Sequence, residues 1–269
     1  MHKPLDKTLA MHSLGEGETI VMLHGWGMHS GMFNDIANHL SQRFRVVRID
    51  LPGHGNSSSQ CSLALEDVSQ QILSQIESPC HWLGWSLGGS IVMNLALMAP
   101  VHFKSMTLLS ASPCFVSQSD WAHGIHADVF ASFADDLQQD YQKTLKKFIA
   151  LQTLSSADRA ITLKQLRQQL FSMGEPDQLA LQQGLDILIK TDLRNPLQNC
   201  QVPGMIVLGE RDQLVPVSVA DYYQSLTNPL QVNIIDKAGH APFLSHHRQV
   251  AGLIENFIQQ HTHDVIDNG

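Results

Sequence analysis

The stretch Trp82-Leu83-Gly84-Trp85-Ser86-Leu87-Gly88-Gly89 contains the pattern G-x-S-x-G over residues 84–88. An apolar run over residues 80–83 precedes the pattern, and apolar residues at helical spacing follow it over residues 87–98. A strand, a sharp turn and a helix in this order hold a serine in a strained turn with its hydroxyl exposed. Flanking glycines remove the side chains that would collide in such a turn. The stretch therefore predicts that Ser86 is a nucleophile, in preference to a glycine-rich structural turn.

Strand and helix patterns alternate through the first part of the chain. Continuous β-branched and apolar runs predict buried strands, and apolar residues at every third or fourth position predict helices. The strands are expected at residues 19–23, 45–49, 80–83 and 106–109, and the helices at residues 32–40, 65–76 and 87–98. Strands and helices that alternate in this way build a parallel sheet.

The pattern changes after residue 111. Residues 112–195 contain amphipathic helical patterns and no strand pattern. The remaining strands are then expected at residues 205–208 and 231–235, and the remaining helices at residues 217–226 and 248–259. We therefore expect an α/β fold whose mostly parallel sheet is formed by residues 1–111 and 196–269. Residues 112–195 would form a helical lid, inserted before the last two strands and lying over the active site.

Composition narrows the class of protein. A chain of 269 residues with 43% hydrophobic and 16% charged residues can bury a large core. Its formal charge of −8 disfavours nucleic acid as a partner. No apolar run is long enough to cross a membrane, and residues 1–15 contain no secretory signal pattern. We expect a cytoplasmic protein that acts as a monomer.

Cysteine and histidine give no sign of a metal site. The four cysteines lie far apart without a C-x-x-C pair: Cys61, Cys80, Cys114 and Cys200. This spacing predicts buried or free thiols in a reducing compartment. The fifteen histidines are scattered, and the pair His261 and His263 falls in a polar tail, where we expect both side chains to be solvated. Neither a metal nor an organic cofactor is expected.

A serine hydroxyl needs a base to take its proton and an acidic group to orient that base. Asp212 follows a predicted strand, which puts its carboxylate at the carboxyl edge of the sheet, where ligands bind in open α/β folds. Glu210 is the second candidate, and a turn or helix-cap carboxylate is the structural alternative for Asp212. His240 follows the last predicted strand, and the glycine before it lets the loop bend toward Ser86. Ser86, Asp212 and His240 are the predicted catalytic set.

Ester chemistry at Ser86 also needs two backbone N–H donors for the negative charge that develops on the reacting oxygen. Leu87, the residue after the nucleophile, would supply one donor. Trp26, in the loop after the first central strand, would supply the other, and its indole would line an acyl pocket. The alternative for Trp26 is a buried core aromatic. His54, in a loop rich in proline and glycine, is expected to be structural rather than catalytic.

The predicted lid carries positive charge, although the chain as a whole is acidic. Residues 143–167 contain one carboxylate, Asp158, against six basic residues, Lys143, Lys146, Lys147, Arg159, Lys164 and Arg167, a net charge of +5. A charge run of this kind is commonly a solvated helix face. The alternative is a docking patch that steers an acidic macromolecular partner toward the active site.

These motifs together resemble the pimeloyl-[acyl-carrier protein] methyl ester esterases of biotin synthesis. The resemblance covers nearly the whole chain, and its most specific parts are Trp82-Leu83-Gly84-Trp85 and Phe148-Ile149-Ala150-Leu151-Gln152-Thr153. Further matching stretches are His24-Gly25-Trp26-Gly27, Asp50-Leu51-Pro52-Gly53, Ser112-Pro113-Cys114-Phe115, Asp192-Leu193-Arg194 and His240-Ala241-Pro242-Phe243. The fold that the resemblance implies is the α/β-hydrolase fold, and the activity is that of a serine carboxylesterase.

The resemblance also implies roles for individual residues. Ser86, Asp212 and His240 would form the triad, with Trp26 and Leu87 at the oxyanion site. Phe148, Ile149, Ala150, Leu151 and Gln152 would bind the substrate together with Trp26, Ser86, Leu87 and His240. The residues expected to dock acyl carrier protein are Lys143, Lys147, Arg159 and Lys164. The substrate would be the methyl ester of a pimeloyl chain on that carrier.

Two other functions fit the same motifs. A generalist short-chain carboxylesterase or lactonase would use the same catalytic set, because a fold does not determine its substrate. A ligand-binding relative without catalysis would close the lid over a small molecule and signal through a partner. The intact set of serine, aspartate and histidine disfavours this last function.

Overall fold

The protein is built around a seven-stranded sheet in the order β1-β3-β2-β4-β5-β6-β7. This computed structural model describes residues 8–76, 79–153 and 159–263. The strands are β1 Met11–Leu14, β2 Thr19–Leu23, β3 Arg45–Ile49, β4 Cys80–Trp85, β5 Phe103–Leu109, β6 Gly204–Gly209 and β7 Gln231–Ile235. β1 pairs with β3 in antiparallel fashion, and the other neighbouring strands are parallel.

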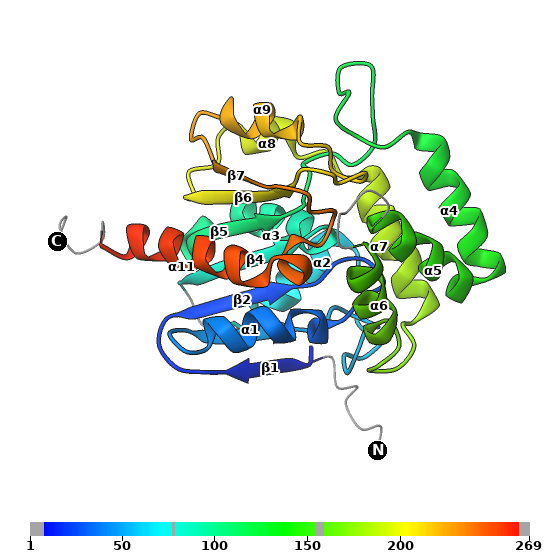
Figure 1. Cartoon of the computed structure of the whole chain (residues 1–269), viewed down its shortest axis with the longest axis horizontal. Helices are drawn as coiled ribbons and strands as arrows, with labels where there is room; N and C mark the ends of the chain where they lie inside the picture. Colours follow the sequence, from blue (N-terminus) through cyan, green and yellow to red (C-terminus); the bar gives the residue numbers. More distant parts are fainter. Residues whose placement is uncertain (1–7, 77–78, 154–158, 264–269) are drawn as a thin grey trace.

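Helices cover both faces of the sheet, with α1 and α11 on one face and α2 and α3 on the other (Figure 1). The helices before the lid are η1 Ser30–Phe33, α1 Asn34–Leu40, α2 Leu65–Leu73, α3 Leu87–Met98 and η2 Pro100–His102. The helices of residues 112–195 and after are α4 Ala127–Gln139, α5 Tyr141–Gln152, α6 Arg159–Gln169, α7 Gln178–Lys190, α8 Arg194–Leu197, α9 Val219–Gln224, α10 Pro242–Ser245 and α11 His247–His263. Among these described helices, none is both long and apolar enough to cross a lipid bilayer.

The central strands β2, β4 and β6 are buried almost throughout, because helices cover them on both faces. β4 lies between β2 and β5, and its last residue, Trp85, pairs with Leu109 at the end of β5. The carboxyl ends of β2, β4, β5, β6 and β7 therefore lie along one edge of the sheet. The loops that follow these strands meet at this edge.

Helices α4 to α7 lie together beyond that edge, on the right of Figure 1. They come between β5 and β6 in the chain. Apolar residues at helical spacing run from Val129 to Tyr141 without a break in the sequence, but the structure divides them between α4 and α5, because the chain turns at Asp140. The Asp140 side chain accepts the Lys143 N–H and so caps the start of α5.

Two further differences from the predicted elements lie outside the lid. β1 was not predicted, because four residues at a sheet edge with an exposed side chain at most positions carry no hydrophobic alternation. β5 begins at Phe103, three residues before the predicted strand, since Lys104 and Ser105 interrupt the apolar run there. The other predicted strands and helices are found, with ends that differ by a few residues. The four cysteines are buried free thiols, as predicted.

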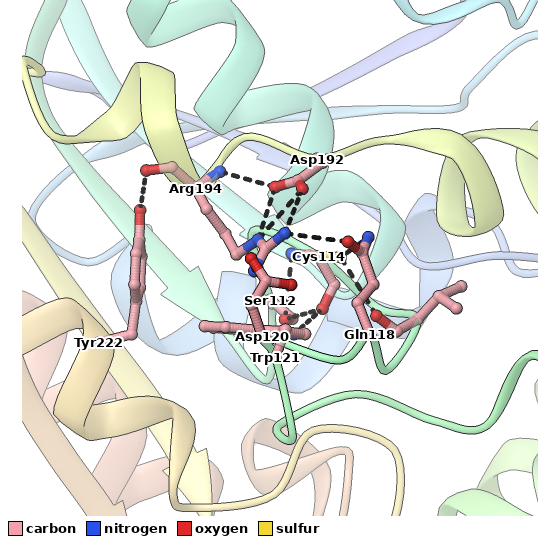
Figure 2. A network of polar contacts seen from close by, with 9 residues as sticks. Ser112, Cys114, Gln118, Asp120, Trp121, Asp192, Arg194 and Tyr222 are labelled. Atoms are coloured by element: carbon pink, nitrogen blue, oxygen red, sulfur yellow. Dashed lines mark hydrogen bonds and ion pairs between the residues drawn. The ribbon is translucent and has the colours of Figure 1, made fainter.

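The two chain segments that connect the lid to the sheet are held to each other. Leu193 N–H donates to the Pro113 carbonyl at 2.9 Å. The Arg194 guanidinium donates to Asp192 at 2.7–3.1 Å and to Asp120 at 3.1 Å, and it stands 5.3 Å from the centre of the Trp121 ring (Figure 2). These hydrogen bonds from Arg194 lower the pKa of the Asp192 carboxyl. The segment that leaves the sheet after β5 and the segment that returns to it before β6 are thus joined to each other.

Candidate active site

Ser86 lies in the turn between β4 and α3, with a backbone φ of 55° and ψ of −115°. This left-handed φ is unfavourable for a residue with a side chain and is typical of functional turns. The close packing of the turn requires glycine on both sides. A Cβ atom at Gly84 would collide with the Gly88 carbonyl, and one at Gly88 would collide with the Leu23 carbonyl. The sequence pattern around Ser86 therefore reflects real steric limits in this fold.

Ser86, His240 and Asp212 form a continuous chain of hydrogen bonds. His240 Nε2 lies 2.9 Å from Ser86 Oγ, and His240 Nδ1 lies 2.8 Å from Asp212 Oδ2. A carboxylate can only accept, so the imidazole carries its proton on Nδ1, and Nε2 is free to accept from the serine hydroxyl. His240 is fully buried, and Ser86 and Asp212 are only 2% and 5% exposed. The arrangement can take the proton from a serine that attacks a carbonyl carbon.

Asp212 is positioned by the turn that follows β6. Its Oδ1 accepts two backbone N–H groups, from Leu214 at 2.8 Å and from Val215 at 3.0 Å. Glu210, the second candidate from the sequence, instead accepts the Lys237 N–H at 2.9 Å and is about half-exposed. Of the two carboxylates, the structure joins Asp212 to His240.

The predicted oxyanion donors lie on the two expected loops. Trp26 follows β2, and Leu87 is the first residue of α3. In the ranges that the structure describes, neither the Trp26 N–H nor the Leu87 N–H donates a hydrogen bond. The N-terminus of α3, directly after Ser86, carries the positive end of the helix dipole, which favours negative charge there.

His24 and His54 lie side by side in the core, with ring centres 5.3 Å apart. Leu51 N–H donates to His24 Nε2, and the other ring nitrogen lies 2.9 Å from the Gly25 carbonyl. His24 is therefore a neutral imidazole that ties the loop of Trp26 to the end of β3. Burial lowers the pKa of His24 to about 3 and that of His54 to about 4. His54 Nδ1 lies 2.8 Å from the Pro52 carbonyl, a contact within its own loop that fits the predicted structural role.

Comparison with known proteins identifies the family. A family model described as the alpha/beta hydrolase fold matches residues 18–247. A protein of Methylococcus capsulatus named pimeloyl-[acyl-carrier protein] methyl ester esterase is 40% identical over 250 residues, which cover 93% of this chain and 98% of that one. A protein of the same name from Xylella fastidiosa is 38% identical over 247 residues, or 91% and 96% of the two chains. The chain belongs to this esterase family.

Several solved structures share the fold of this chain. An esterase from Exiguobacterium antarcticum superposes with a TM-score of 0.83 at 21% identity, over 93% of this chain and 95% of that one. An enol-lactonase from Burkholderia xenovorans gives a TM-score of 0.79 at 17% identity, over 93% and 96% of the two chains. At these identities the likeness concerns the fold alone. The α/β-hydrolase fold predicted from the sequence is confirmed.

In this pimeloyl-[acyl-carrier protein] methyl ester esterase family member, helix α5 presents its buried face to the site. The Phe148 ring meets the Trp26 ring edge-on at 4.9 Å. One turn later, Gln152 is 3% exposed, and its side-chain Oε1 has no hydrogen-bond partner in the described part of the chain. Ile149 is also buried, whereas Ala150 and Leu151 are partly exposed. Phe148 and Gln152 thus share the inward face of α5.

The Trp26 side chain makes a contact that the sequence could not reveal. Its indole N–H donates to the Leu181 carbonyl on α7 at 2.7 Å, and its ring leaves no room for a Cβ atom at Gly184. Trp26 therefore joins the loop after β2 to α7. Its partner lies 155 residues away in the chain, so no local pattern could indicate it.

The residues predicted to dock a partner lie on the surface of this protein. Lys143 and Lys147 are exposed on α5, and Arg159 and Lys164 are exposed on α6. The structure adds an acidic residue that the sequence window did not include. Asp136 of α4 lies 2.6 Å from Lys147 and forms an ion pair with it. Asp158, the one carboxylate of that window, lies outside the described residues.

Proposed function

We propose that this chain hydrolyses the methyl ester of a pimeloyl group carried on acyl carrier protein, releasing methanol and the free carboxylate. The observation that carries the proposal is the buried chain of hydrogen bonds from Ser86 through His240 to Asp212. It occurs in a chain that is 38–40% identical to relatives named for this reaction. Such a chain of hydrogen bonds activates a serine for attack on an ester carbonyl.

The reaction would proceed through an acyl-enzyme. Ser86 Oγ attacks the ester carbonyl while its proton passes to His240 Nε2, and the N–H groups of Trp26 and Leu87 stabilise the oxyanion. The imidazolium then gives the proton to the methoxide, which leaves as methanol. A water molecule, deprotonated by the same imidazole, attacks the acyl-enzyme and releases the carboxylate with Ser86 restored. Asp212 keeps the imidazole in the required tautomer and stabilises its protonated form.

The acyl chain would pass along the inward face of α5. The edge-on rings of Phe148 and Trp26 provide an apolar wall next to the proposed oxyanion donor. Ser86 and Trp26 are almost completely buried, so an ester reaches Ser86 only if side chains or helices of the lid move. A pocket that closes around the chain excludes water from the reacting carbonyl, which strengthens electrostatic stabilisation of the oxyanion.

Acyl carrier protein would dock on the outer face of the lid. The support is the positive charge of α5 and α6, whose exposed cations include Lys143, Lys147, Arg159 and Lys164. An acidic carrier would be attracted to this face, which raises its rate of association. The attraction between exposed charges weakens as salt is added.

The test compares pimeloyl methyl ester on acyl carrier protein with p-nitrophenyl acetate. We expect the carrier-bound ester to give the higher kcat/KM, and reversal of Lys143 and Lys147 to glutamate to lower kcat/KM for that ester alone. The matched control reverses Arg45 and Lys104, at the amino ends of β3 and β5 and away from the lid. An equal loss on both substrates would contradict docking at α5. Turnover of the small ester alone would indicate a generalist esterase, and failure of Ser86 to react with a fluorophosphonate would indicate a protein that only binds.

A further inference from the structure

The peptide groups of His240 are held as firmly as its ring. The His240 N–H donates to the Gln152 carbonyl at the end of α5, at 3.1 Å. The His240 carbonyl accepts the indole N–H of Trp85 at 2.8 Å. With the ring bonds to Ser86 and Asp212, four hydrogen bonds hold this one residue. His240 lies in a loop, so its position depends on these bonds rather than on a regular helix or strand.

Trp85 is tightly enclosed at the point where it meets His240. Its ring is completely buried, lies edge-on to Phe243 at 5.0 Å and is 5.9 Å from the His240 ring. On the other side, a Cβ atom at Gly25 would come within 3.0 Å of the indole. The indole therefore fills the space between the loop of Trp26 and the loop of His240, and it can hardly turn its N–H away from the His240 carbonyl.

We propose that Trp85 is a positioning residue, whose indole N–H holds the His240 loop so that Nε2 remains within reach of Ser86 Oγ. Trp85 immediately precedes Ser86 in the chain, so one residue of the β4 turn sets the position of the base relative to the nucleophile. A displacement of about 1 Å in such a pair costs about 10²-fold in rate. This inference rests on the proposed function only in that Ser86 and His240 are the reacting pair.

The hydrogen bond from the Trp85 indole to the His240 carbonyl can be removed by substitution. The hydrogen bond from the His240 N–H to Gln152 cannot be removed in this way. Gln152 contributes its backbone carbonyl, which every replacement retains. Replacement of Trp85 by phenylalanine removes the N–H and keeps an aromatic ring. Replacement by histidine keeps a five-membered ring with an N–H that can lie near the position of the indole N–H.

The chain offers a close control in Trp82, three residues earlier on the same strand. Trp82 is 1% exposed, and its indole N–H also donates to a backbone carbonyl, that of His102 at 3.0 Å. Its bond lies at the opposite end of β4 from Ser86. Trp82→Phe and Trp85→Phe therefore each remove one buried hydrogen bond between an indole and a carbonyl, but only Trp85→Phe acts next to the base.

The experiment measures kcat and KM for p-nitrophenyl acetate, the rate of inactivation by a fluorophosphonate, and Tm, in the wild type and the three variants. Trp85→Phe should lower kcat and the inactivation rate by about 10- to 100-fold with little change in KM. Trp85→His should recover part of this loss. Trp82→Phe should lower Tm by about as much as Trp85→Phe does, but it should leave kcat unchanged. The downfield proton resonance of His240 Nδ1–H should weaken or shift in Trp85→Phe alone.

Three outcomes would overturn the inference. Equal losses of kcat in Trp85→Phe and Trp82→Phe would indicate a general effect of destabilisation. A raised KM with unchanged kcat would mean that Trp85 acts on substrate binding. Full activity of Trp85→Phe, or of Trp85→Leu if the phenylalanine variant does not fold, together with an unchanged Nδ1–H resonance, would mean that other contacts hold His240, because neither variant carries the N–H donor. Because the ester is small and free, failure of carrier docking would leave these results unaffected.

Discussion

Replacement of Asp212 by asparagine has a consequence that follows from the contacts of its two oxygens. Asp212 Oδ1 accepts the N–H groups of Leu214 and Val215, and Oδ2 accepts His240 Nδ1–H. Only an oxygen can accept the two backbone donors, so the asparagine amide must turn its NH₂ group toward His240. Nδ1 then accepts a hydrogen bond, and the imidazole carries its proton on Nε2. In that tautomer His240 cannot take the proton of Ser86.

The expected loss is about 10⁴-fold in kcat, the usual effect of a wrong tautomer in a triad of serine, histidine and aspartate. At about 1.36 kcal/mol for each factor of ten, this is about 5.4 kcal/mol of transition-state stabilisation. KM should change little, because the amide occupies the same volume. The free energy of unfolding should fall only slightly, since the two backbone bonds to Oδ1 are retained. Steady-state hydrolysis of p-nitrophenyl acetate and of the carrier-bound ester measures the effect on both substrates.

Glu210→Gln is the matched control, because it neutralises the neighbouring carboxylate without touching His240. Glu210 accepts the Lys237 N–H at 2.9 Å, a bond that a glutamine oxygen can also accept. Its kcat should stay within about two-fold of the wild type, as expected for a surface charge without contact to the reacting groups. A loss below about ten-fold in Asp212→Asn, or an equal loss in Glu210→Gln, would refute the assignment of Asp212 as the group that orients the base.

Two further predictions concern pH and the lid. Burial lowers the pKa of His24 from 6.5 to about 3, and that of His54 and His81 from 6.5 to about 4. As the pH falls below 6.5, these histidines bind protons in the unfolded chain but stay neutral in the folded chain, which favours unfolding. The urea midpoint should therefore be lower near pH 5 than near pH 7.5, and His81→Gln should reduce the difference; equal midpoints in the wild type would contradict this. Asp136→Asn should free Lys147 and raise kcat/KM for the carrier-bound ester by about two- to five-fold, because an exposed ion pair contributes at most about 1 kcal/mol. Asp186→Asn, which breaks the exposed pair with Lys190, is the control, and an equal rise on p-nitrophenyl acetate would exclude competition between Asp136 and the carrier.

The hydrogen-bonded set of Ser86, His240 and Asp212 could be predicted from the sequence because each member belongs to a local pattern. Ser86 lies between two glycines that its turn requires, and Asp212 and His240 each follow an apolar run that forms a strand. In a parallel sheet, loops after the strands meet at one edge, so three separate motifs imply one site. The strand that the sequence missed, β1, lies at the sheet edge, where exposed side chains carry no periodic signal.

The lid shows where prediction from local patterns ends. Its helical content was predictable from amphipathic spacing, but the break at Asp140 depends on a capping side chain, and a continuous apolar face obscures it. Asp136 and Lys147 are 11 residues apart and lie on two consecutive helices, so a count of charges along the chain could not indicate their pairing. The exposed face of α5 is therefore less positive than the sequence window suggests.

By itself, the sequence determined the order of the six strands β2 to β7, the glycine turn around Ser86, and the loops that carry Asp212 and His240. All of these depend on interactions within a few residues, which leave patterns in the chain. The tertiary structure alone shows how Trp85 and Gln152 hold the peptide groups of His240. The Trp85 partner lies 155 residues away, and the contact exists only after the sheet has brought the ends of its strands together.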